Sequence, residues 1–547
     1  MADPKEVHRR VMMILGAFLM VMGLAAAYLA FSTGGLPSFF YGLASTAPVS
    51  PRIEKLRPNL VAWNAWGPAA FAKAKKSDRL VLLDISARWS HASIQTDQTL
   101  WADSGTASFV AQHFIPVRID ADARPELLLR YPPRAWPALD ILLPSGAPLA
   151  GGSAMTPELF RGWASEILSA YRKRPEAAAR WALQRENALS SAENREIQET
   201  SAGSQSPRRR LAAIWNPASA ANALTSVFPF FERISLLERT PYPWARNMAR
   251  QGAAAALHLE DPQWGGFYRC ARGPGWAHPA TGKRLSEQAR AVEALASANP
   301  EAAARTAAYV DEFLADPRGG YAASQAADLE EPGGVLLEGD YYFSLPDKRR
   351  RALGVPRVDR RLFAAGNGLM AQAVLNNRRI AGPRAVRQAE RTLSRWWREG
   401  IKNGCARHEL SEPRGLSCYL ADETDLGLAF LAEYGAFHRS NSLAHALAVA
   451  RAMEKNLAVR GSAALRDRPA PNTAADKSAA LLDPTLNARA AIFYGRLAEA
   501  LPAGAAKRAF RGRAQALRLW AERRGQDLEP ALEAFLAART KSGSDAR

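Results

Sequence analysis

The spacing of apolar positions divides this chain of 547 residues into an α/β part and a helical part. Three apolar runs in the first part have the length and composition of buried strands: 80–85, 114–120 and 138–143. A turn signal at 144–146 follows the third run, and an amphipathic stretch over 157–171 then predicts a helix with Thr156 as its N-cap. This order of elements predicts a thioredoxin-like domain over residues 60–173.

Helical periodicity dominates the chain from residue 211 to about 540. A stripe from Leu285 to Leu295 is typical, and loops that carry glycine or proline, such as 265–266, separate the helical stretches. Paired helices with long loops at one end predict an α/α toroid, with an open solenoid as the alternative that periodicity leaves. Residues 174–210 are predicted to be a linker and 541–547 a short tail.

The N-terminal segment carries a membrane signal. An unbroken apolar run over residues 11–31 is long enough to cross a bilayer as a helix. Basic residues precede the run and none follows it until Arg52, so the positive-inside rule places residues 1–10 in the cytoplasm and the rest outside. Residues 32–59 are predicted to be a tether. A cleaved signal peptide is the alternative for this segment.

The formal net charge is +19, and it is spread along the chain with short clusters at 208–210 and 348–351. No zinc-finger spacing or other nucleic-acid-binding fingerprint accompanies these clusters, so we expect no nucleic-acid partner. A solvated arginine-rich surface explains the charge. Binding to anionic lipid headgroups or to an acidic protein is the alternative.

Three cysteines are present, Cys270, Cys405 and Cys418, and no Cys-x-x-Cys pair exists. The sequence therefore predicts no metal site built from cysteines, and no cofactor. Cys405 and Cys418 flank a turn signal at 411–415, so they are candidates for a disulfide that would contribute about 3 kcal/mol. Two free buried thiols are the alternative. Cys270 is expected in a core.

The turn Ser86–His91, together with Trp136-Pro137, lies where a thioredoxin-like domain carries its redox cysteines, and it contains no sulfur. A dithiol site needs a nucleophilic thiolate and a resolving partner. Ala87 has no nucleophile, and the Ser90 hydroxyl stays protonated near neutral pH unless a base lies beside it. His91 is not that base, because adjacent residues of a helix do not face each other. The sequence therefore predicts binding rather than redox catalysis here.

Short motifs occur in a shared order along both parts. Trp63, Trp66, Ala70 and Phe71 match a Trp-x-x-Trp-x-x-x-Ala-Phe opening, and 135–137 matches Gly-Trp-Pro. On these motifs residues 63–487 resemble the spermatogenesis-associated thioredoxin-like family, whose bacterial members pair a thioredoxin-like domain with an (α/α)6 toroid. The family's Cys-His-Trp-Cys-His is replaced, and the resemblance makes Pro137 a cis-proline facing the turn. We expect a degenerate redox site of Ala87, Arg88, Trp89, Ser90, His91 and Pro137.

The resemblance continues into the helical part. Residues 265–269 match Gly-Gly-Phe-His-Arg, whereas Ala280 and Gly282 replace the His and Glu of a Trp-x-Val-Pro-His-Phe-Glu motif. The residues able to do acid/base work are therefore missing. A candidate pocket at the toroid mouth would collect the remaining polar groups: Arg269, Trp276, Lys283, Asp340, Asp359, Asn367, Asp422 and Asn487.

These expectations combine into a function of the binding class. The sequence and the resemblance predict a single-pass protein of a bacterial inner membrane, largely periplasmic, that acts as a non-redox scaffold or assembly module for an envelope protein complex. One alternative is an epimerase- or glycosidase-like enzyme that binds a small molecule in the toroid with two carboxylates about 5–10 Å apart. The other is a thiol-independent holdase that pairs peptides with the cis-proline edge.

Overall fold

The computed structural model describes residues 52–53, 56–133, 135–194, 228–272, 276, 278–412, 418–469 and 481–523. The expected N-terminal tail and transmembrane helix, most of the tether, the second half of the linker and the C-terminal tail lie outside these residues. Within them, no helix combines the length and the apolar character that a membrane span requires.

A five-stranded mixed sheet organises the α/β part, in the order β2-β4-β3-β5-β6. Its strands are β2 (Asn64–Ala65), β3 (Leu80–Ser86), β4 (Phe114–Asp120), β5 (Ala138–Leu142) and β6 (Pro148–Gly152). β2 and β3 both pair with β4 in parallel, whereas β5 pairs antiparallel with β3 and with β6. The three central strands are the three apolar runs of the sequence, and their arrangement is that of a thioredoxin-like domain.

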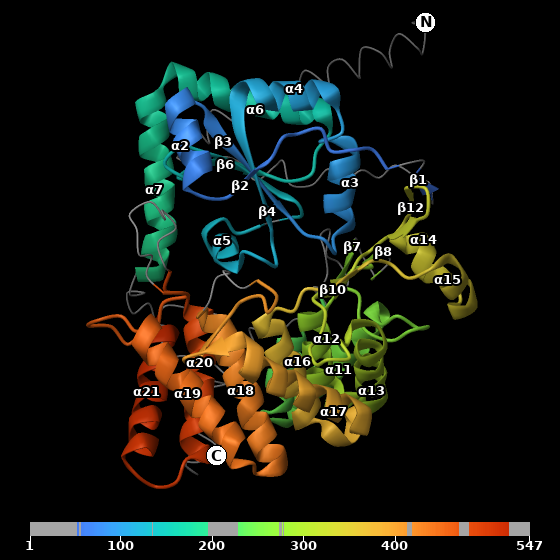
Figure 1. Cartoon of the computed structure of the whole chain (residues 1–547), viewed down its shortest axis with the longest axis vertical. Coiled ribbons are helices and arrows are strands. Elements are labelled where there is room, and N and C mark those ends of the chain that lie inside the picture. Colours follow the sequence, from blue (N-terminus) through green and yellow to red (C-terminus); the bar gives the residue numbers. More distant parts are fainter. Residues whose placement is uncertain are drawn as a thin grey trace, which may run out of the picture. The chain divides into compact units, whose positions relative to one another are not determined.

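Helices cover both faces of this sheet: α2 (Pro68–Ser77), α3 (His91–Thr99), α4 (Ser104–His113), α5 (Pro125–Arg130), α6 (Pro157–Lys173) and α7 (Pro175–Asn194). Alternate residues of β3 enter two cores because successive side chains of a strand point to opposite faces. Leu80 and Leu82 pack with α4 and α6, while Val81 and Leu83 pack with α2 and α5. The first half of the expected linker is α7, which packs beside β6 (Figure 1).

The end of the expected tether is bonded to both halves of the molecule. β1 (Arg52–Ile53) pairs antiparallel with β12 (Val335–Leu337), which also pairs with β11 (Leu329–Glu331). Further along, the N–H of Leu60 donates to the carbonyl of Trp101 in the α/β part.

The helical part contains five consecutive helix pairs in its described residues (Figure 1): α10 (Phe231–Glu238) with α11 (Pro243–Ala256), α12 (Leu285–Ala298) with α13 (Pro300–Tyr309), α16 (Ala364–Asn376) with α17 (Arg378–Arg395), α18 (Leu420–Phe437) with α19 (Ser440–Leu457), and α20 (Pro484–Ala500) with α21 (Ala505–Glu522). The first members of successive pairs contact one another and form an inner layer, and the second members lie outside. This is the arrangement of an α/α toroid.

Long loops precede the N-terminal ends of the inner helices, and these loops contact the α/β part. They carry short elements: β7 (Cys270–Arg272), β8 (His278–Ala280), β9 (Lys283–Arg284), β10 (Ser324–Gln325), α14 (Gly339–Ser344), α15 (Asp347–Leu353), β13 (Val358–Asp359), β14 (Ile401–Lys402) and β15 (Cys405–Ala406). β9, β10 and β13 form one small sheet, and the pairs β7–β8 and β14–β15 form two more. The loops therefore place polar side chains at the end of the toroid that faces the thioredoxin-like domain.

Candidate functional site

The degenerate redox turn lies at the end of β3, beside the start of β5. Ile85 of β3 pairs with Ala138 of β5, and the peptide bond that precedes Pro137 is cis. The rings of Trp89 and Trp136 meet edge to face with their centroids 5.2 Å apart. The turn and the proline therefore lie together, which is the placement that the resemblance implies.

Ser90 serves the local fold rather than any reaction. Its hydroxyl oxygen accepts a hydrogen bond from the N–H of Ser93 at 3.4 Å, which caps α3. The hydroxyl of Ser93 in turn accepts from the N–H of Ala87 at 3.2 Å. His91 directs its Nδ1 to Asp328 instead of to Ser90. Ser90 is also only 8% exposed, so its hydroxyl has little access to solvent.

The helical part covers the turn. Trp89 is only 2% exposed, and a Cβ atom placed on Gly282 would lie 2.2 Å from the Trp89 carbonyl oxygen. The guanidinium carbons of Arg269 and Arg284 each lie 4.9 Å from the Trp89 ring centre, within cation–π range. The indole N–H donates to Asp122 at 3.0 Å. The surface on which a thioredoxin would meet a substrate is here an internal interface.

His91 joins the two halves directly. Its Nδ1 lies 2.9 Å from both carboxylate oxygens of Asp328, in the loop before β11. The Asp328 side chain is fully buried, and its Oδ1 also accepts from the N–H of Gly339 at 2.9 Å. A buried carboxylate needs such partners, because leaving it unpaired is costly.

An arginine pair binds the acidic end of β4. Asp120 accepts hydrogen bonds from Arg88 and from Arg361, each at 3.1 Å. Arg361 also pairs with Asp359, one of the candidate pocket residues. Burial would raise the pKa of Asp359, but the hydrogen bonds and the charge of Arg361 lower it. Asp359 is therefore an ion-pair partner and not a general acid.

His408 forms a buried bridge across the interface. Its Nε2 lies 2.8 Å from the backbone oxygen of Asp122, and its Nδ1 lies 2.8 Å from Oδ2 of Asp422. Burial would lower the pKa of His408, but the Asp422 carboxylate and these hydrogen bonds raise it to about 9. The imidazolium is therefore protonated at neutral pH, and each nitrogen donates to one half of the molecule.

Tyr419 and Glu126 complete the contact. The Tyr419 hydroxyl donates to Oε2 of Glu126 at 2.8 Å, and burial raises the pKa of Tyr419. Neither His408, Tyr419 nor Glu126 was expected at a site. The one available signal was the cluster of acidic residues directly after the strand at 114–120.

The residues of the expected toroid pocket take part in several different contacts. Arg269 lies on Trp89, Asp359 and Asp422 are in the ion pairs above, and Asp340 is exposed on α14. The Trp276 ring lies parallel to the ring of His258 at 6.1 Å between centroids. Arg269, Asp359 and Asp422 therefore lie at the contact with the thioredoxin-like domain, whereas Trp276 packs on His258.

Lys283 is a structural anchor. Its fully buried Nζ lies 2.8 Å from Oδ2 of Asp261 and 4.2 Å from the ring centre of Tyr309. Arg350, also fully buried, binds the same carboxylate at 2.8 Å. Burial, partly offset by Asp261, lowers the pKa of Lys283 to about 8. The charges in this cluster satisfy one another and hold three loop segments together.

The two candidate asparagines act as clamps on loop backbone. In each clamp a side-chain amide binds both the N–H and the carbonyl of one loop residue. The described residues contain three such clamps: Gln288 with Phe267, Asn367 with Tyr321 and Asn487 with Leu465. The amide oxygens accept at 2.7 Å and the amide nitrogens donate at 2.9–3.0 Å. Each clamp residue is the fourth of its inner helix. The repeat unit is therefore a loop fastened to the start of the next inner helix.

One group of metal-type ligands lies close together among the described residues. Cys405, Cys418 and Glu423 offer ligand atoms within 4.8 Å of one another. The two sulfurs are joined in a disulfide, so neither is a thiolate, and we assign no metal to this group. Cys270 is buried and belongs to no disulfide.

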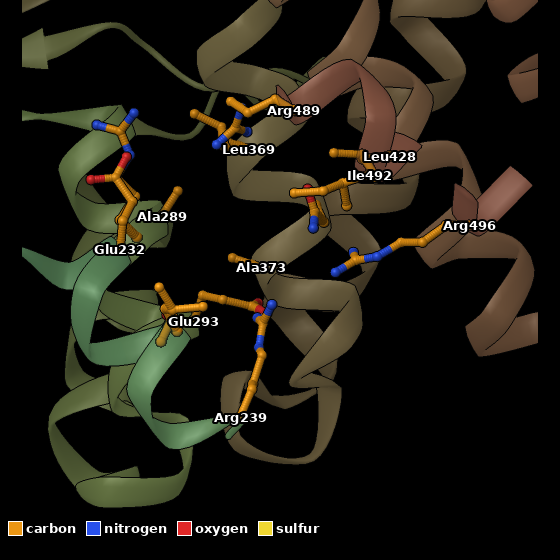
Figure 2. A pocket seen from close by; sticks show the side chains of 14 residues that line it. Glu232, Arg239, Ala289, Glu293, Leu369, Ala373, Leu428, Arg489, Ile492 and Arg496 are labelled. Carbon is orange, nitrogen blue, oxygen red and sulfur yellow. The ribbon is translucent and has the colours of Figure 1, made fainter. Parts of the chain in front are cut away.

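A cavity of about 100 Å³ lies among the five inner helices. Four arginines and two glutamates line it: Arg239, Arg290, Arg489, Arg496, Glu232 and Glu293. Both glutamates are paired, Glu232 with Arg290 at 2.7 Å and Glu293 with Arg239. Figure 2 shows Arg496 extending from its helix into the space between the inner helices. Arg489 is in turn paired with Asp425, so acids hold at least three of the four arginines, and the positive charge that remains favours an anionic occupant.

Comparisons with known proteins agree with the α/β part of this description. Residues 45–194 match the family described as a protein of unknown function, DUF255, a thioredoxin-like family. Spermatogenesis-associated protein 20 is 26% identical over 117 residues in Rattus norvegicus and 25% identical over 117 residues in Homo sapiens. The matched segment is 20% of this chain and only 15% of either relative. An uncharacterised protein of Caenorhabditis elegans is 25% identical over 121 residues, 21% of this chain and 17% of its own length.

Solved structures resemble about half of this chain, and only weakly. Cellobiose 2-epimerase from Bacillus thermoamylovorans gives a TM-score of 0.42 at 9% identity and covers 56% of this chain and 82% of its own. Unsaturated glucuronyl hydrolase from Bacillus sp. GL1 gives 0.34 at 13% identity, over 53% and 71%. These scores support no conclusion about ligand or activity. The sequence match, the mixed sheet and the cis-proline turn together show a thioredoxin-like domain that is similar, over residues 45–194, to the DUF255 family and, over a shorter segment, to the spermatogenesis-associated proteins.

Proposed function

We propose that this chain is a membrane-anchored, extracytoplasmic scaffold whose thioredoxin-like domain carries out no thiol chemistry and serves as a fixed cover for the toroid. The burial of the former redox turn supports this proposal most directly. Trp89 and Ser90 are 2% and 8% exposed, and Gly282 lies against the backbone at Trp89. A substrate has no access to such a turn. Cysteines in this turn could therefore not react with a substrate, and their absence removes no activity that this fold permits.

Cysteine accessibility tests the closed turn. Ser90→Cys places a near-isosteric thiol in the turn, and Ser169→Cys places one on the exposed face of α6. The Ser90→Cys thiol should react with Ellman's reagent at least about 100-fold more slowly than the Ser169→Cys thiol, because reaction requires local opening. The parent chain, with its buried Cys270, gives the background rate. Comparable rates for the two variants would refute a closed turn.

The anchor and the partner rest on the sequence. The apolar run at 11–31, with basic residues before it and none until Arg52, supports a single span with the folded parts outside. Protease added to spheroplasts should then digest the helical part and spare an N-terminal tag. Affinity purification from solubilised membranes should recover one stoichiometric envelope protein. Cytoplasmic protection of the whole chain would contradict the placement.

A second candidate function is small-molecule binding in the inner-helix cavity, and its charged lining favours that reading. The arginines of the lining suit an acidic ligand. If the cavity instead held a carbohydrate that the protein converts, Glu232 or Glu293 would be the acid or base. Both glutamates are held by arginines, which favours binding over proton transfer. A uronic acid should raise the melting temperature more than glucose does, and Arg496→Gln should remove the difference. An equal effect of both sugars would reject the acidic-ligand reading.

A further inference from the structure

The disulfide of the helical part lies against a buried carboxyl group. Cys405 belongs to β15, Cys418 lies two residues before α18, and the two sulfurs are bonded. Glu423 is the fourth residue of α18, is fully buried, and has a carboxyl oxygen within 4.8 Å of both sulfurs. Its Oε1 accepts a hydrogen bond from the N–H of Ala406 at 2.6 Å.

Glu423 breaks the pattern of the clamps. It occupies the position in α18 that Gln288, Asn367 and Asn487 occupy in their helices, and like them it binds loop backbone. An amide both accepts and donates, whereas a carboxylate only accepts. Oε2 of Glu423 is buried without a hydrogen-bond partner. An amide would fasten this loop as well as it fastens the others, so structure alone does not account for an acid here.

The surroundings disfavour the ionised form of this acid. Burial raises the pKa of Glu423 well above its usual range, and the nearby Asp422 adds to the effect. Asp422 is itself paired with His408, from the loop before α18. The hydrogen bond from the backbone of Ala406 acts in the opposite direction and lowers the pKa of Glu423, but burial is the larger effect. Beside the disulfide, Nδ2 of Asn456 in α19 lies 3.2 Å from Sγ of Cys405.

We propose that Cys405 and Cys418 form a thiol–disulfide exchange site in which Glu423 gives and recovers the proton. This goes beyond the scaffold function, which concerns the turn at Ser90. Cys405 is partly exposed and Cys418 is 2% exposed, so Cys405 is the sulfur that an incoming thiolate reaches.

The exchange with a dithiol reductant balances in two steps. The thiolate of the reductant attacks Sγ of Cys405 and forms a mixed disulfide, while the Cys405–Cys418 bond breaks and its electron pair goes to Sγ of Cys418. Glu423 donates its proton to that sulfur. The second thiolate of the reductant then attacks the reductant's first sulfur, which is bonded to Cys405 in the mixed disulfide. The reductant's disulfide forms, and the Cys405 thiolate is released. The two protons lost by the reductant restore Glu423 and protonate Cys405. The asparagine amide beside Cys405 is placed to stabilise that leaving thiolate.

The test uses the intact chain and dithiothreitol, with free thiols followed by mass spectrometry. Glu423→Gln is the informative variant, because it restores the amide that the other clamps use. Glu433→Gln, which removes a buried acid near the other end of α18, is the matched control. Reduction of the wild-type disulfide should be faster than global unfolding measured by denaturant jump. Glu423→Gln should slow it about tenfold or more near pH 7 while the melting temperature is kept, and Glu433→Gln should leave the rate unchanged.

Two results would overturn the proposal. One is reduction of the wild-type disulfide only at the rate of global unfolding, which marks a purely structural bond. The other is an equal rate in Glu423→Gln and the wild type, which removes the acid from the exchange. If Glu423→Gln lowers the melting temperature, the rates are compared at equal free energies of unfolding in added urea, so the acid's role is still decided. Neither result depends on Ser90, so the scaffold function stands or falls separately.

Discussion

Gly282 lies so close to Trp89 that no side chain fits between them: a Cβ atom at residue 282 would lie 2.2 Å from the Trp89 carbonyl oxygen. The clash is with backbone, so no side-chain rotation relieves it. In this chain the residue that replaces the family's glutamate is thus the one that allows the toroid loops to press against the thioredoxin-like turn.

Gly282→Ala should therefore separate the two halves. We expect a loss of about 2–3 kcal/mol in the free energy of unfolding, in the range of overpacked interfaces. The Ser90→Cys thiol should become more reactive in the same background. Urea denaturation and the labelling rate measure the two effects. Gly162→Ala, in the interior of α6 with nothing within 4 Å of the new methyl group, is the control; it should leave the labelling rate unchanged and raise stability slightly, by about 0.5–1 kcal/mol, because alanine favours a helix more than glycine does. Unaltered stability and labelling in Gly282→Ala would show that the contact is not tight.

The pair His91–Asp328 should show strong coupling. Removing either partner leaves a buried polar group unsatisfied, so His91→Ala and Asp328→Asn should each cost about 1–3 kcal/mol. The double variant should cost clearly less than the sum, with a coupling energy of at least about 1 kcal/mol. A double-mutant cycle from urea denaturation near pH 6 and near pH 8 measures this. Simple additivity at both pH values would mean that the two residues do not interact in solution.

His408 should make the interface weaken in alkaline solution. Its pKa is raised from 6.5 to about 9 in the folded state, so its contribution is fully present below pH 6.5 and is lost as the pH rises through 9. The size of the shift corresponds to about 3 kcal/mol. Lys283, whose pKa is lowered from 10.5 to about 8, contributes the opposite slope. The difference between wild type and His408→Gln across pH 6–10 isolates the histidine. A difference that does not change with pH would exclude this role.

The strands of this fold could be predicted from the sequence, whereas the contact between the thioredoxin-like domain and the toroid could not. A continuous apolar run such as 80–85 is dictated by burial on both faces of a sheet, and β3 occupies it almost residue for residue. For Trp89 and His91 the sequence indicated an exposed binding surface, because in a thioredoxin-like domain this turn normally faces a substrate. Their partners, Gly282 and Asp328, lie far along the chain in loops without periodicity. No local pattern in the sequence predicts contacts between residues that are so far apart along the chain.

The asparagines illustrate a partial success. The order of the motifs identified Asn367 and Asn487 as candidates. From the sequence alone, however, a polar residue at the start of a helix fits a ligand-binding role as well as it fits a structural clamp. Their true partners precede them by 46 residues in one case and by 22 in the other. Unequal loop lengths therefore hide the repeated clamp from any search for a fixed period.

Asn367→Asp separates the clamp role from a ligand role. The carboxylate keeps an acceptor for the N–H of Tyr321 but loses the donors to the carbonyls of Tyr321 and Phe363, at 3.0 and 2.9 Å. It also places a charge at a site with no exposure, so the free energy of unfolding near pH 7 should fall by about 3–5 kcal/mol. The folded-state pKa of the new acid lies above its unfolded value, so the penalty is full above the folded pKa. It shrinks as the pH falls toward 4, where the protonated acid donates again. Asn247→Asp, on the exposed face of α11, is the control and should change stability by less than about 0.5 kcal/mol. A pH-independent loss under 1 kcal/mol in Asn367→Asp would mean that the amide is dispensable to the fold and is free to serve a ligand.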